Sequence, residues 1–119
     1  MCYTIFIVDN NQLGNIMAKK IFVCSPLRGD IQGNMEKAKE YCKYVILEGN
    51  IPYAPHVFFT QFLDDNVPTE RELGILGGLE FLKVCDELFV FGDKITEGMS
   101  KEITLANSLG KNVVFVDGK

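Results

Sequence analysis

The sequence predicts an α/β fold, a three-layer sandwich in which a mainly parallel sheet lies between helices. Short apolar runs typical of strands alternate along the chain with longer segments whose apolar residues have helical spacing. Connections of this kind make the strands parallel and place the helices on both faces of the sheet. With 119 residues, the chain is expected to form one domain with a real core.

The first half of this pattern begins with a strand at residues 21–24 and a turn at 25–30 that contains proline and glycine. An amphipathic helix follows and ends at Gly49, and a second strand is expected at residues 51–54. The apolar residues that mark this helix recur three and four positions apart: Met35, Ala38, Cys42, Val45 and Ile46.

The second half begins with a longer connection, residues 55–67, before a helix that runs from Pro68 to about Val84. Proline suits the first turn of a helix because its missing N–H would have no partner there. A third strand is expected at residues 88–91, a last helix at 100–109 and a final strand at 113–116.

Two interpretations remain open for residues 1–16, which contain the apolar run Ile5–Val8 and a turn-prone segment after it. Met17 is the natural start in one interpretation, and the apolar run forms an extra edge strand in the other. The domain itself is therefore expected to span residues 17–119.

Composition restricts the partners of this chain. Its net charge of −4 argues against binding nucleic acid through phosphates, and its apolar runs are too short to span a membrane. The four cysteines lack the spacing of a zinc site and are expected to be reduced thiols, with no metal and no cofactor. We expect a cytoplasmic protein that binds a small molecule; its cysteines are Cys2, Cys24, Cys42 and Cys85.

Three polar clusters are candidates for a site at one edge of the sheet, where open α/β sheets bind ligands. The turn 25–30 follows the first strand, Asp86 precedes the third, and Glu102 lies in the expected last helix. A carboxylate in the first turn of a helix faces the positive end of the helix dipole, so Glu102 is expected to be ionised at neutral pH. It could attack an anomeric carbon with Asp86 as its partner, or simply stabilise the helix.

Ser25 and Arg28 are placed to hold a phosphate, a carboxylate or a sugar hydroxyl, although Arg28 could also be an ordinary surface residue. His56 follows the second strand and is either catalytic or structural. Asp64 and Asp65 have the character of a solvated loop tip.

Close helix packing is the best explanation for three glycines in the expected helix 68–84, because glycine is costly inside a helix. The apolar part of this helix, residues 73–82, suits a contact between subunits, so a homodimer or higher homo-oligomer is expected. The glycines are Gly74, Gly77 and Gly78.

Taken together, the motifs resemble the nucleoside 2-deoxyribosyltransferase-like superfamily, and most closely its small uncharacterised members. The similarity runs from Lys20 to about Val116. Its motifs are jointly specific, although none suffices alone. They are Ser25-Pro26-Leu27-Arg28-Gly29, Pro52-Tyr53-Ala54-Pro55-His56, Thr60-Gln61-Phe62-Leu63-Asp64-Asp65, and Cys85-Asp86-Glu87 through Gly98-Met99-x-x-Glu102-Ile103.

This resemblance implies a flavodoxin-like or Rossmann-like fold, sites near subunit contacts, and chemistry at an N-glycosidic bond. The glutamate that matches Glu102 attacks C1′ of a 2′-deoxyribose in that superfamily, and Asp86 matches an aspartate near the sugar and base. The turn at Arg28 is similar to that of deoxynucleoside 5′-monophosphate N-glycosidases, where it receives the 5′-phosphate. The implied substrate-binding residues are Ser25, Pro26, Leu27, Arg28, Gly29, Asp30, His56, Thr96, Glu97, Gly98 and Met99.

Two departures from the superfamily pattern keep a second hypothesis open. Phe22 stands where many enzymes have a tyrosine, and Thr96 stands where the transferases have an aspartate, with Glu97 adjacent. These changes favour a non-catalytic module that captures a nucleotide, for instance an ADP-ribose-like or cyclic nucleotide signal, as a phage protein opposing host defence would. Retention of Glu102 and Asp86 favours an enzyme.

Overall fold

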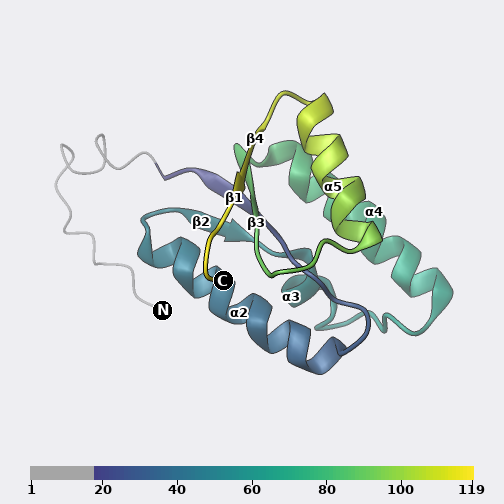
Figure 1. Cartoon of the computed structure of the whole chain (residues 1–119). Helices are drawn as coiled ribbons and strands as arrows, with labels where there is room; N and C mark the ends of the chain where they lie inside the picture. Colours follow the sequence, from purple (N-terminus) through teal and green to yellow (C-terminus); the bar gives the residue numbers. More distant parts are fainter. Residues whose placement is uncertain (1–17) are drawn as a thin grey trace, which may run out of the picture.

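A four-stranded, all-parallel sheet forms the centre of the protein in the computed structural model, which describes residues 18–119 (Figure 1). The strand order is β2-β1-β3-β4, which reverses between β1 and β3 as in doubly wound folds. The predicted α/β class is therefore confirmed, whereas the expectations for residues 1–16 fall outside the described part. The strands are β1 (Lys20–Cys24), β2 (Ile51–Tyr53), β3 (Glu87–Val90) and β4 (Asn112–Phe115).

Helices cover both faces of the sheet and make two separate cores. Helix α2 (Ile31–Leu47) packs on the face that carries Ile21 and Val23, where Tyr41 stacks on Phe91 with ring centroids 4.5 Å apart. Helices α4 (Pro68–Val84) and α5 (Glu97–Ser108) cover the other face, above Phe22 and Cys24. Because successive side chains of a strand point to opposite faces of the sheet, the buried side chains of β1 are divided between the two cores.

Most helix ends follow from local sequence, and two differ from expectation. Helix α4 has the predicted bounds, and α2 ends two residues before Gly49, whose φ of +88° suits a glycine. The expected connection 55–67 contains a five-residue helix, α3 (Pro55–Phe59). Helix α5 begins at Glu97 rather than at Ser100, because the Thr96 side chain caps it.

The glycines of α4 serve a contact within the chain. A Cβ on Gly77 would overlap the ring of Phe59, and one on Gly78 would lie 3.3 Å from Pro55. Close helix packing is confirmed as the role of Gly77 and Gly78, where α3 of the same chain occupies this face, but not of Gly74, whose Cβ would make only ordinary contacts. Gly77 therefore faces Phe59 of its own chain, whereas the expected subunit contact through residues 73–82 and the homo-oligomer remain predictions.

Substituting Gly77 with alanine is expected to destabilise the fold by about 1–3 kcal/mol, because Phe59 must move out of a packed position. Gly74→Ala is the matched control, since its Cβ would meet Leu63 at an ordinary 3.8 Å and gain up to about 1 kcal/mol of helix propensity. Urea unfolding measures both. Equal effects of the two substitutions would contradict the α3–α4 packing described here.

Two further expectations concern the cysteines and the membrane. Cys24 and Cys85 are buried and Cys42 is half-buried, and all three are free thiols, as predicted. No helix within residues 18–119 is long and apolar enough to cross a membrane.

Candidate functional site

A cavity of about 360 Å³ opens at the carboxyl-terminal edge of the sheet. It lies where the strand order reverses between β1 and β3, the position at which open α/β sheets bind ligands. Its walls come from the turn after β1, from α3 and the loop after it, from α4 and from the start of α5. Its size suits a small molecule rather than a polymer.

Most of the residues predicted from sequence meet in this cavity. Three others shape the turn after β1 without lining the cavity: Gly29 has a φ of +104°, Asp30 caps α2 by accepting from Gly33 N at 3.1 Å, and Pro26 packs against Gly92. The predicted residues that do line it are Ser25, Leu27, Arg28, His56, Thr96, Glu97, Gly98, Met99 and Glu102.

Asp86 lies at the opposite edge of the sheet. It directly precedes β3, and its carboxylate accepts a hydrogen bond from Lys20 N, at the start of β1, at 2.7 Å. The residue before a parallel strand sits at the amino-terminal edge, away from the strand ends that form the cavity. The expectation that Asp86 partners Glu102 is therefore wrong, and Asp86 instead caps the start of β1.

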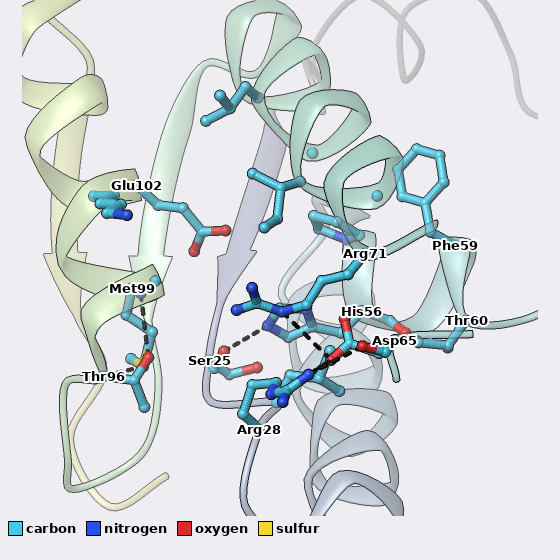
Figure 2. A pocket seen from close by; sticks show the side chains of 18 of the residues that line it. Ser25, Arg28, His56, Phe59, Thr60, Asp65, Arg71, Thr96, Met99 and Glu102 are labelled. Carbon is cyan, nitrogen blue, oxygen red and sulfur yellow. Dashed lines mark hydrogen bonds and ion pairs between the residues drawn. The ribbon is translucent and has the colours of Figure 1, made fainter. Parts of the chain in front are cut away.

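Glu102 points from α5 into the cavity (Figure 2). Since α5 begins at Glu97, Glu102 lies in the second turn, where all backbone N–H groups are already paired. Burial raises the pKa of Glu102 to about 7, against a weaker lowering by the nearby Cys24 thiol. The expectation of a fully ionised carboxylate is therefore wrong: near pH 7 both protonation states are populated.

The start of α5 is held by reciprocal contacts between Thr96 and Met99. The Thr96 hydroxyl accepts from Met99 N at 3.2 Å, and Thr96 N donates to Met99 Sδ at 3.5 Å. Met99 itself is buried, and its carbonyl accepts from the Cys24 thiol at 3.8 Å. These contacts tie the helix that carries Glu102 to the end of β1.

His56 connects α3 to the turn after β1. Its Nε2 lies 2.7 Å from the carbonyl oxygen of Ser25, which can only accept, so the imidazole donates from Nε2. Burial lowers the pKa of His56, which keeps the ring neutral at pH 7. The buried Ser25 hydroxyl, by contrast, has no hydrogen-bond partner among the residues that the structure describes.

An ion-pair cluster of Arg28, Asp65 and Arg71 borders the cavity on the side of α4 (Figure 2). Arg28 NH1 lies 2.9 Å from Asp65 Oδ2, and Arg71 Nε lies 3.8 Å from the same oxygen. The Asp65 side chain is only 15% exposed, so its expected place at a solvated loop tip is wrong. Sequence reasoning missed Arg71 altogether, although Asp65 belongs to one of the motifs that carry the superfamily resemblance.

The wall between Glu102 and the arginines is apolar. It is formed by side chains of α3, of the loop after it and of α4, interrupted by glycines that leave room for a ligand. A side with two arginines, an apolar wall and a titrating carboxylate together suit a ligand that has an apolar ring and a negative group. The apolar wall consists of Phe59, Leu63, Gly74, Ile75, Gly78 and Leu79.

No group of three or more His, Cys, Asp or Glu side chains within residues 18–119 is arranged to hold a metal ion. The ionisable side chains that line the cavity are Arg28, His56, Asp65, Glu70, Arg71, Glu97, Lys101 and Glu102.

Comparison with protein families matches residues 19–116 to a domain of unknown function, DUF7768. The chain belongs to this family. Among solved structures, the family member is similar to a 2-deoxyribosyltransferase from the psychrotolerant bacterium Bacillus psychrosaccharolyticus, with a TM-score of 0.60 and 22% sequence identity. The match covers 81% of this chain and 70% of the transferase, and supports a shared fold. Comparison with curated proteins finds no match.

Proposed function

We propose that this DUF7768 protein cleaves or transfers at the N-glycosidic bond of a nucleoside or nucleotide, with Glu102 as the nucleophile. The observation that carries the proposal is the position of Glu102: its carboxyl group points into a cavity whose opposite side has two arginines. The similarity of the fold to a 2-deoxyribosyltransferase supports this reaction class.

The reaction would proceed in two displacements. A Glu102 carboxylate oxygen forms a bond to C1′ as the bond between C1′ and the base nitrogen breaks, and the electron pair leaves with the base. The departing base takes a proton from water, since Asp86 lies at the other edge of the sheet. Water or the N–H form of a second base then attacks C1′, gives its proton to the hydroxide left by the first step and releases the Glu102 carboxylate, which completes hydrolysis or transfer.

A binding module that captures a nucleotide without reaction is the second candidate. It is favoured by the absence of Asp86 from the cavity and by Phe22, whose side chain is fully buried in the core and offers no hydroxyl to orient Glu102. The same cavity would serve this function, with Glu102 as a polar contact to the ligand.

Incubation with a panel of deoxynucleosides and their 5′-monophosphates distinguishes the two candidates. Chromatography should detect free base that increases with protein concentration and time. Native mass spectrometry of the same mixtures reports retained ligand. A ligand that is retained intact, with no base released from any member of the panel, would overturn the enzymatic proposal in favour of the binding module.

We also propose that the ligand is a small molecule and that the protein is a cytoplasmic homo-oligomer. The binding site is then formed by one chain alone or is completed by a second copy. Light scattering at micromolar concentration should give a mass above the 13.4 kDa of one chain. A monomer with full ligand affinity would exclude a shared site.

A further inference from the structure

Arg71 is placed to contact a ligand although the sequence analysis did not select it. It lies in the first turns of α4 and lines the cavity, and its guanidinium points inward toward the side on which Glu102 lies (Figure 2). Its Nε faces Asp65 Oδ2 at 3.8 Å, a loose pairing. The two η nitrogens extend beyond Asp65 with four N–H donors in a planar fork.

Arg28, the predicted phosphate ligand, is engaged elsewhere. Its NH1 donates to the Asp65 carboxylate at 2.9 Å and to the Asp65 carbonyl at 3.0 Å. These two bonds fix the loop between α3 and α4 against the turn after β1. Arg28 therefore holds Asp65 in place, and the Asp65 carboxylate attracts the Nε of Arg71 across 3.8 Å.

The charges of this cluster leave room for an anion. Two guanidinium groups share the single carboxylate of Asp65. The neighbouring carboxylate, Glu70, accepts a hydrogen bond from Asp64 N at 2.8 Å and is turned toward the loop backbone. The unpartnered hydroxyl of Ser25 lines the same cavity and offers a further donor.

We propose that Arg71 determines specificity by binding the phosphate of a phosphorylated substrate, while Arg28 positions it through Asp65. A guanidinium fork matches two phosphate oxygens in parallel hydrogen bonds, a geometry that an ammonium group cannot reproduce. The identity of the ligand as a nucleotide rests on the proposed function, whereas the binding of a phosphate by Arg71 does not.

The test compares the affinities of a deoxynucleoside and its 5′-monophosphate by calorimetry, in a Glu102→Gln background so that no ligand is consumed. Adding Arg71→Gln is expected to weaken monophosphate binding by about tenfold or more and to change nucleoside binding by less than about twofold. Arg71→Lys should retain part of the preference. Lys83→Gln, an equal charge change near the far end of α4, is the matched control and should affect neither ligand.

Arg28 is tested as a positioning residue by a double-mutant cycle. Arg28→Ala alone should weaken monophosphate binding. In the Arg71→Gln background it should add less than about a twofold loss, because both substitutions disable the same phosphate contact. Additive losses would show that Arg28 contacts the phosphate itself and would overturn its role as a positioning residue. Melting curves confirm that each variant is folded, and Arg71→Lys serves if the glutamine variant is not.

Inorganic phosphate provides the arm that is independent of the nucleotide. Inorganic phosphate should compete with the monophosphate for the protein that retains Arg71. It should no longer compete in the Arg71→Gln variant. If no base is released from any nucleotide but this pattern holds, the proposed function fails and the inference about Arg71 stands. Equal losses for nucleoside and monophosphate, or no loss for either, would overturn the inference even in an active enzyme.

Discussion

Glu102→Gln is expected to reduce base release by about a thousandfold or more, because a neutral amide cannot form the bond to C1′ that the proposed mechanism requires. The substitution is nearly isosteric and lies at the cavity wall, so the fold should survive. Initial rates of base release and melting curves of the same preparations measure the two effects. The shape of the cavity is unchanged, so ligand affinity should be largely retained.

The control for this substitution is Glu80→Gln, which removes an equal charge from an exposed ion pair with Lys83 on α4. It should leave the rate of base release within about twofold, since exposed ion pairs contribute little. Full activity of the Glu102→Gln protein would remove Glu102 from the mechanism.

The second large effect is a pH dependence of both rate and stability that originates in Glu102. Burial raises its pKa to about 7, whereas the proposed nucleophile is the ionised form. The rate of base release should therefore rise about tenfold per pH unit below 7 and level off above it. A rate that is already constant at pH 5 would contradict a buried Glu102 as the nucleophile.

Stability should respond to pH in the opposite direction. In the unfolded chain, Glu102 has a normal glutamate pKa of 4.5. Between pH 4.5 and 7, Glu102 is therefore mostly protonated in the folded protein and mostly ionised in the unfolded chain. Because the native state binds more protons there, this group makes the free energy of unfolding decrease as pH rises, by about 3 kcal/mol at most.

The Glu102→Gln variant is the reference for measuring this pH dependence of stability. His56 changes the stability in the opposite direction. Because its pKa is lowered in the folded protein, the free energy of unfolding decreases as pH falls below 6.5. The comparison is therefore between wild type and Glu102→Gln, in which the His56 contribution cancels. Urea unfolding at pH 5 and pH 8 should show the glutamine variant gaining stability relative to wild type at the higher pH. An unchanged difference between the two proteins would contradict the raised pKa.

Elements with long periodic patterns were predictable from sequence, and short or unusually capped ones were not. Helix α4 has a proline at its start and an uninterrupted run to Val84, and its predicted bounds are confirmed. Helix α3 has five residues, too few for a helical period to be visible. The start of α5 was missed because its capping partner is Met99 rather than the usual glutamate or glutamine.

The candidate site was predictable where it follows strand ends. Ser25, His56 and Glu102 come together because the turns after β1, β2 and β3 share one edge of the sheet. Asp86 was misplaced because it precedes its strand, a position that puts it at the other edge.

The ion-pair cluster of Arg28, Asp65 and Arg71 could not be predicted in the same way. It joins a turn, a loop and a helix whose mutual positions depend on the packing of Phe59 against Gly77, which no local pattern encodes. The raised pKa of Glu102 likewise depends on its burial, which follows from tertiary packing and not from a local pattern.

The anomeric configuration of a trapped product tests the proposed covalent mechanism most directly. Reaction of a β-configured deoxynucleoside 5′-monophosphate in water containing methanol should release base and form methyl 2-deoxyriboside 5-phosphate, whose configuration is stable and is assigned by NMR. Two displacements through Glu102 retain configuration, so the account predicts the β-glycoside and its loss in Glu102→Gln. An α-glycoside would show direct attack on the substrate by solvent and would contradict Glu102 as the nucleophile.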